Sequence, residues 1–167
     1  MSNNTLKVVD DVKVHIGVNP KARAKVAKHL SGFLASTYTL YMKTLFYHWN
    51  VTGPHFPGLH KLFEDQYQEL HMAGDELAER VRALGHMTPG TYREFTQLSK
   101  IKEDEELPKD SHTMLENLMK SHEACSLEAR EVLNVAEDCG DEVTVDMMVE
   151  RMSFHDKTAW MLRATIE

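Results

Sequence analysis

The sequence is poor in the residues that interrupt secondary structure. Its 167 residues include only 8 glycines and 5 prolines, and these gather at a few places along the chain. Since Gly and Pro mark turns and loops, this distribution predicts a few long elements, and therefore helices. The length fits one domain with a sizeable core.

Other features are missing as well. No apolar run approaches the 18 residues of a membrane span, and the N-terminus has no signal-peptide pattern, so a cytoplasmic protein with no membrane partner is expected. The only cysteines, Cys125 and Cys139, form no metal or redox motif and are expected to be reduced, packed thiols. The formal net charge of −7 disfavours wholesale binding to nucleic acid or anionic membranes, although a local basic patch remains an alternative.

Start and stop signals divide the chain into a tail and four long helices. Residues 1–19 lack a helical period and are expected to form a flexible N-terminal tail, and residues 20–167 one bundle. An Asn N-cap and a Pro at the first helical position mark the first start. The expected helices run from Asn19-Pro20 to Thr52, from about Pro57 to Gly85, across 91–98 as one short helix, from Asp110-Ser111 to Gly140, and onward from Asp141 or Thr144.

The connections between these helices predict the topology. The first and second long helices are tightly joined, as are the third and fourth, whereas about 25 residues separate the second from the third. One long middle crossover containing a short helix is typical of an all-α, ferritin-like four-helix bundle. A cytokine-like bundle is the alternative, but it would need two long connections.

Polar side chains of the second helix form a stripe beside its apolar face. At about 100° per residue the members of this stripe all lie on one side of the helix. They are His60, Glu64, His71, Asp75 and Glu79. A solvated helix face is the simple alternative. Histidines within the stripe, and charges that are almost all negative, favour a bound cation instead.

His48 completes half of a metal site. His48 and His60 each lie six residues from the turn at Pro54, so a helical hairpin brings them face to face. Together with Glu64 they form a set of N and O donors that suits Fe or Mn, and also Zn.

The other half of the site must come from elsewhere. Asp75 and Glu79 lie 15 residues further along the same helix, roughly 22 Å away at 1.5 Å per residue. A second copy, antiparallel across a two-fold axis near residues 69–70, would bring them opposite the histidines and give two identical sites. The sequence also has no Glu-x-x-His, the motif of a di-iron centre held within one bundle.

These residues stand in segments that resemble the Dps family. The likeness covers nearly the whole chain from about residue 20 onward. It rests on His48-Trp49-Asn50-Val51-x-Gly53, Phe56, Leu59-His60, Phe63-Glu64, Asp75-x-x-Ala78-Glu79-Arg80, Leu84-Gly85, Asp141-Glu142-x-Thr144-x-Asp146 and Lys157-x-Ala159-Trp160.

The resemblance implies a ferroxidase and iron-storage protein that protects against oxidative damage. It implies a homododecamer built from two-fold dimers, with Fe(II) oxidised by hydrogen peroxide in preference to dioxygen and ferric oxide stored inside. It also implies two iron positions per intersubunit site, with Zn or Mn as possible substitutes: His48, His60 and residue 64 would come from one subunit, and Asp75 and Glu79 from its neighbour. Family members often have Asp where this chain has Glu64, and the extra methylene moves the carboxylate by about one C–C bond length.

Two residues near the expected site have alternative readings. Trp49 adjoins His48, and the resemblance implies that it intercepts oxidising equivalents. The alternative is a large aromatic side chain that covers the site and fills the interface. His71 is expected either to pair with its copy across the two-fold axis or to act as an additional metal ligand.

Acidic residues open the last helix. The resemblance implies that Asp141, Glu142 and Asp146 line a three-fold pore that draws Fe(II) inward. The alternative is helix capping and a favourable interaction with the helix dipole, and one carboxylate can do both.

A DNA-compacting nucleoid protein, with ferroxidase activity secondary, is the alternative function. The charged side chains of residues 1–19 cancel, and the chain ends at Glu167 without an expected tail. Lys21, Arg23, Lys25 and Lys28 do form a basic start to the first helix. Weak or absent DNA binding is therefore expected.

Overall fold

The computed structural model describes residues 13–166, which form five helices and no strand. The first 12 positions of the expected tail lie outside the described residues. The helices are α1 (Pro20–Asn50), α2 (Phe56–Ala83), α3 (Tyr92–Leu98), α4 (Ser111–Asp138) and α5 (Glu142–Ile166).

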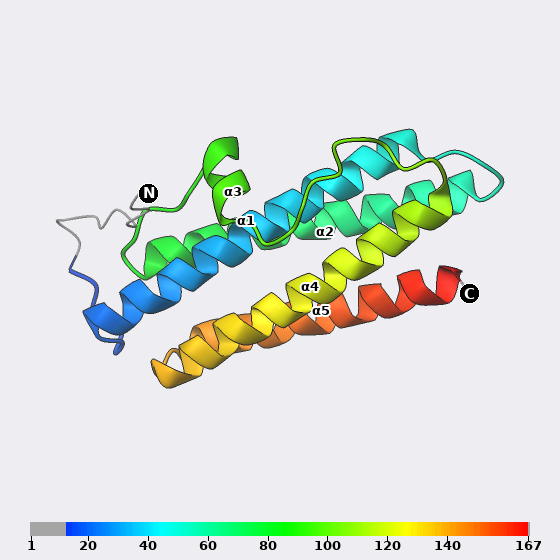
Figure 1. Ribbon diagram of the computed structural model, residues 1–167. Helices are drawn as coiled ribbons and strands as arrows, with labels where there is room; N and C mark the ends of the chain where they lie inside the picture. Colours follow the sequence, from blue (N-terminus) through cyan, green and yellow to red (C-terminus); the bar gives the residue numbers. More distant parts are fainter. Residues whose placement is uncertain (1–12, 167) are drawn as a thin grey trace.

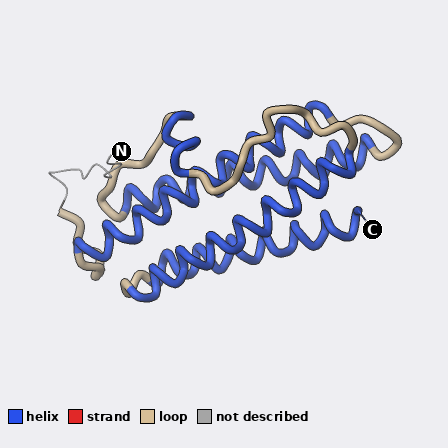
Figure 2. The backbone as a smooth tube through the Cα atoms, viewed as in Figure 1, coloured by secondary structure: helices blue, strands red, loops and turns tan. Residues whose placement is uncertain are grey.

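The long helices form two antiparallel hairpins, α1–α2 and α4–α5, packed into one bundle (Figure 1). The crossover between α2 and α4 carries α3 and returns along the bundle as an irregular segment (Figure 2). The α1–α2 turn therefore lies at the same end as the start of α4 (Figure 1). This arrangement confirms the expected all-α bundle with a short helix in its crossover. None of the helices in residues 13–166 is long and apolar enough to cross a bilayer.

Side-chain caps fix where the helices begin. The Asn19 side chain accepts a hydrogen bond from the Ala22 amide at 3.0 Å, and Pro20 follows it at the first helical position. Asp110 accepts from the Thr113 amide at 2.7 Å, and this bond lowers the pKa of Asp110. Gly85 ends α2 with φ +88°, a left-handed conformation that other residues rarely adopt. The starts predicted at residues 20 and 111 are confirmed.

All four long helices contribute to a single core. Fully buried side chains include Phe33 of α1, Phe63 of α2, Leu118 of α4 and Met148 of α5. Each such side chain stabilises the fold by about 1.5–3 kcal/mol. The apolar side chains along one face of α2 and of α4 are buried in this core. On α1, Tyr41 is only half-buried.

The short helix α3 is held against α1 by aromatic stacking. The rings of Tyr38 and Phe95 lie 4.9 Å apart and within 9° of parallel. Tyr38 reaches α3 by passing over Gly74 of α2, where an added Cβ would lie 3.0 Å from the tyrosine ring. Glycine thus lets a long aromatic side chain cross the helix pair.

Candidate metal centre

His48 and His60 face each other across the α1–α2 hairpin, as predicted. Their rings stack at 3.7 Å and 20°. Nδ1 of His48 donates to the carbonyl of His60 at 2.8 Å, and Nδ1 of His60 donates to the carbonyl of His48 at 2.9 Å. Two backbone carbonyls thus fix the orientation of the two rings relative to each other.

These reciprocal hydrogen bonds fix the tautomer of both imidazoles. A carbonyl oxygen only accepts, so each Nδ1 carries a proton, and in a neutral ring the lone pair then lies on Nε2. Histidine ligands of metals are commonly oriented in this way, with one ring nitrogen donating to the protein and the other facing the metal. The hairpin therefore presents two prepared nitrogen donors.

Glu64 lies one turn after His60 on α2 and is partly exposed. Its carboxylate accepts a hydrogen bond from Lys61 at 2.9 Å, and Lys61 also pairs with Asp65 at 2.8 Å. The Lys61 hydrogen bond is the main cause that lowers the pKa of Glu64. The carboxylate is therefore ionised at neutral pH and already holds one cationic partner.

Asp75 and Glu79 do not join the histidines within one chain. Both are exposed on α2, about 22 Å (Asp75) and about 28 Å (Glu79) beyond His60 at the rise of an α-helix. His71, between the two groups, is exposed and packs its ring 5.7 Å from that of Tyr41. Within residues 13–166 no group of three or more His, Cys, Asp or Glu side chains converges on a possible metal position.

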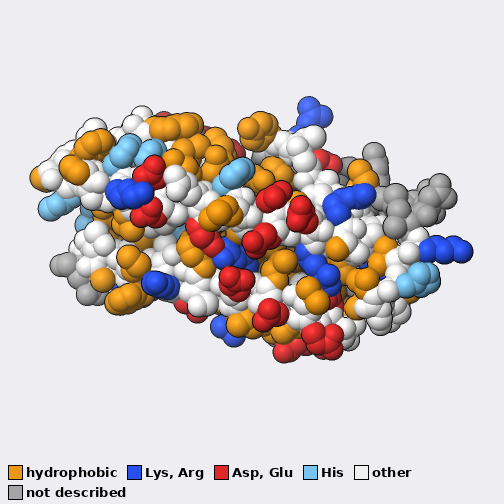
Figure 3. Space-filling view, turned by 180° about the vertical axis from the view of Figure 1, so that it is seen from behind, with side chains coloured by type: hydrophobic (Ala, Val, Ile, Leu, Met, Phe, Trp, Pro, Cys, Tyr) orange, Lys and Arg blue, Asp and Glu red, His pale blue; other side chains and the backbone are white. Residues whose placement is uncertain are grey.

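Aromatic side chains surround the histidine pair. Tyr67 meets His48 edge-on at 5.1 Å, and Phe56 lies 5.0 Å from His60. Trp49 is 63% exposed beside His48. Histidines gather at the end of the molecule that carries the α1–α2 turn, and acidic side chains run along the middle of the same face (Figure 3).

A pocket of about 530 Å³ opens beside this face, between α1, α2 and α3. Tyr38, Tyr41, Phe95 and other apolar side chains line it, and His71 stands at its edge. Met42 of the same lining and Met72 nearby on α2 are exposed, the latter by 61%. The surface formed by α1 and α2 thus carries both this largely apolar pocket and exposed methionine side chains.

The three acidic residues at the start of α5 differ in their surroundings. Asp141 is buried, pairs with Arg80 of α2, and accepts hydrogen bonds from the Thr144 hydroxyl at 2.6 Å and the Thr144 amide at 3.2 Å. It caps α5 and ties it to α2. Glu142 and Asp146 are exposed. Lining of a pore by these three residues stays a prediction, and the contacts of Asp141 favour its capping role.

A second histidine pair, which was not predicted from the sequence, lies between α4 and α5. His122 of α4 and His155 of α5 are fully buried, with their Nδ1 atoms 2.9 Å apart, so that one donates to the other. Both Nε2 atoms are buried without a partner among the described residues. The sequence does contain a pattern that indicates their burial. His122 lies three residues before Cys125 and His155 three residues after Met152, so each histidine falls on the apolar side of its helix.

Comparisons with known proteins identify the family of the chain. A family model for the ferritin-like domain matches residues 27–167. The chain is 35% identical over 148 residues to a DNA protection during starvation protein of Porphyromonas gingivalis, covering 89% of this chain and 92% of that protein. It is also 36% identical over 156 residues to an uncharacterized low temperature-induced protein of Nostoc, covering 93% and 87%.

Solved structures are similar over nearly the whole chain. A Dps protein from Vibrio cholerae, described as a member of a broad superfamily of ferritin-like diiron-carboxylate proteins, superimposes with a TM-score of 0.88 at 30% identity, covering 94% of this chain and 99% of that one. Dps from Staphylococcus aureus superimposes with a TM-score of 0.82 at 32% identity, covering 85% and 95%.

Proposed function

Because the chain belongs to the Dps branch of the ferritin-like family, we propose that it oxidises Fe(II) with hydrogen peroxide at sites shared between two subunits. The ferric product is stored as an oxide inside a shell of twelve copies, which protects the cell from oxidative damage. Iron is thus the substrate and the cargo.

The reciprocal hydrogen bonds of His48 and His60 are the observation that carries this proposal. A simple surface pair of histidines has no need for both Nδ1 atoms to be satisfied by backbone carbonyls at 2.8 and 2.9 Å. This arrangement leaves both Nε2 atoms as the possible ligands of one cation. Imidazole nitrogens with carboxylates suit Fe, and Zn(II) or Mn(II) should compete for the same donors.

A second copy of the chain supplies the carboxylates. The histidine pair and the Asp75–Glu79 pair lie on the same side of α2, on opposite sides of the two-fold axis proposed near residues 69–70. Antiparallel packing of two α2 helices then builds two identical centres. The exposed Met72 and Trp49, together with the pocket beside α3, provide apolar surface for this interface.

The residues of the chain act mainly by binding and by balancing charge. Glu64, Asp75 and Glu79 offset most of the charge of two Fe(II) ions, and hard carboxylate oxygens favour the ferric product. In the proposed reaction two Fe(II) ions lose one electron each, and one hydrogen peroxide takes up both electrons and two protons to give two waters. Lys61 keeps Glu64 ionised and must exchange its place for the incoming cation.

Anaerobic Fe(II) oxidation by added peroxide tests this function. The wild-type protein should oxidise Fe(II) rapidly and remain soluble with its iron, and peroxide should act faster than dioxygen. His48→Gln/His60→Gln removes both nitrogen donors and should slow oxidation at least about tenfold, as loss of metal ligands or their supporting groups typically does.

His112→Gln is the matched control, because His112 is exposed on α4 with its side chain 58% accessible. It should leave the rate unchanged. Equal rates in all three proteins would show that the histidine pair is not a site of iron oxidation.

A further inference from the structure

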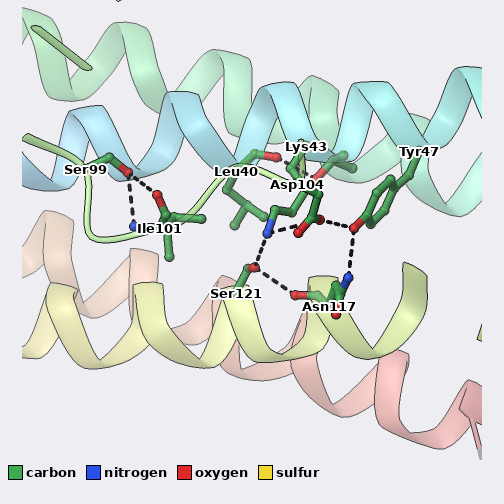
Figure 4. Close-up of polar contacts among 9 residues, drawn as sticks. Leu40, Lys43, Tyr47, Ser99, Ile101, Asp104, Asn117 and Ser121 are labelled. Atoms are coloured by element: carbon green, nitrogen blue, oxygen red, sulfur yellow. Dashed lines mark hydrogen bonds and ion pairs between the residues drawn. The ribbon is translucent and has the colours of Figure 1, made fainter. Parts of the chain in front are cut away.

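On another face, the crossover after α3 is fastened to α1 and α4 by a polar network. Tyr47 donates a hydrogen bond to Asp104, and Asn117 donates to the Tyr47 hydroxyl at 3.1 Å (Figure 4). Burial and the Asp104 hydrogen bond raise the pKa of Tyr47, so its hydroxyl stays protonated and keeps donating. Asp104 is thus held at a fixed position over the two helices.

Lys43 is the buried cation of this network. Its side chain is only 7% exposed, and its ammonium lies 3.3 Å from Asp104 and 3.4 Å from the Ser121 hydroxyl (Figure 4). Both distances exceed the 2.7–2.9 Å usual for charge-assisted hydrogen bonds. An ammonium has three donors, and these two long contacts leave it poorly satisfied for a group so deeply buried.

A pocket of about 210 Å³ opens directly against Lys43. Lys100, Lys102 and Lys120 line it as well, so four lysines converge on one hollow in a chain whose net charge is −7. Lys100 pairs with Glu131 of α4, and Lys120 pairs with Glu116 of the same helix. Exposed pairs of this kind are weak and readily exchanged.

The single carboxylate of the lining narrows the choice of anion. Both contacts of Asp104 use Oδ2, which leaves Oδ1 as an acceptor. A carboxylate repels an anion without protons but accepts a hydrogen bond from a P–OH group. Inorganic phosphate keeps at least one such proton at neutral pH, whereas sulfate and phosphodiesters have none. Since one water takes up about 30 Å³, the pocket accommodates a phosphate ion with part of its hydration.

We propose that this pocket binds inorganic phosphate. Lys43 and the three lysines at the rim neutralise its charge, the second N–H of the Asn117 amide donates to an oxygen, and Asp104 accepts the hydrogen bond from the P–OH group. The proposal is independent of iron oxidation, because Asp104 and all four lysines lie outside the histidine centre.

Isothermal titration of the iron-free protein with inorganic phosphate, at constant ionic strength and neutral pH, tests the assignment. The wild type should bind saturably at millimolar concentrations or below. Lys102→Gln/Lys120→Gln should weaken binding about tenfold or more. Both lysines are exposed, so their replacement should leave the fold intact. Lys21→Gln/Lys28→Gln removes the same charge from exposed positions of α1 and should bind as the wild type does.

Competition by other anions identifies the ligand. Sulfate, a small phosphomonoester and duplex DNA should each displace phosphate poorly. Displacement by sulfate or DNA as effective as by phosphate itself would overturn the proposal, as would equal affinities in the two double variants or a lack of saturable binding.

Discussion

The two histidine pairs of this protein have opposite surroundings at the level of single atoms. His48 and His60 satisfy both Nδ1 atoms with backbone carbonyls, so their Nε2 atoms are the possible metal ligands. His122 and His155 instead bond to each other within the core, with both Nε2 atoms buried. The first pair can take up a cation, whereas the second pair must remain uncharged.

The buried pair should make the protein acid-labile. Burial lowers the pKa of His122 from 6.5 to about 3, and burial together with His122 and Arg151 lowers that of His155. Between about pH 6.5 and 3 the unfolded chain therefore binds protons that the folded chain does not. His122 should then reduce the free energy of unfolding by about 1.4 kcal/mol per pH unit as the pH falls through this range, and His155 should lower it in the same direction.

Urea unfolding at fixed protein concentration, at pH 7, 6 and 5, measures this effect. His122→Leu/His155→Leu should flatten the loss of stability below pH 6.5. His55→Gln/His112→Gln, a control at two exposed positions, should lose stability as the wild type does. Parallel curves for all three proteins would contradict the argument.

Single residues were predictable from sequence where a pattern repeats and not where a contact is long-range. The turn-centred spacing of His48 and His60 predicted that they meet, and the structure brings them together. Lys43 lies on the buried side of α1 only because Asp104, 61 residues later, returns to meet it. The spacing of apolar residues along α1 cannot predict an ion pair with a residue so distant in the sequence.

At the level of elements, the acidic residues at the start of α5 differ in burial and in the contacts that they make. Asp141→Asn should destabilise the protein by about 3–5 kcal/mol, because it breaks a buried ion pair with Arg80. Asp146→Asn removes an exposed charge and should leave the melting temperature unchanged. If the predicted pore exists, this second change should slow Fe(II) uptake at low salt, and the difference should shrink as salt rises.

Thermal unfolding and iron-uptake rates of the two variants distinguish the roles. Glu137→Gln, an exposed neighbour in the last turn of α4, tests whether any lost negative charge has the same effect. An Asp141→Asn protein as stable as the wild type would show that the buried ion pair with Arg80 does not stabilise the fold. Unchanged uptake by the Asp146→Asn protein at every salt concentration would remove this residue from the pore.

Helix ends were readable from the sequence because their chemistry is local. Asn19 before Pro20 and Asp110 before Ser111 accept the amide hydrogen bonds expected of caps. Burial was less predictable on α1, where Tyr41 faces α2 and the pocket beside α3 and is only half-buried. The one-dimensional apolar period does not indicate which neighbour covers which part of a helix.

At the level of the whole molecule, the charge balance argues against DNA binding by this protein. The chain carries a net charge of −7, and Lys25 at the basic start of α1 lies near Asp138 at 3.9 Å. Little retardation of duplex DNA is therefore expected at about 150 mM salt, where screening acts beyond about 8 Å. A clear gel shift under these conditions would contradict the expectation, and Lys21→Gln/Lys28→Gln would then test whether α1 is responsible.

The shared centre is most directly tested by mixing two inactive variants. His48→Ala/His60→Ala chains lack the nitrogen donors, and Asp75→Ala/Glu79→Ala chains lack the carboxylates. In a co-assembled dimer of one chain of each kind, one of the two interface sites receives an intact set from both subunits. Fe(II) oxidation should return to about half the wild-type rate per mixed dimer, while each variant alone stays inactive. Verified mixed dimers that remain as inactive as their parents would contradict a centre shared across the two-fold axis.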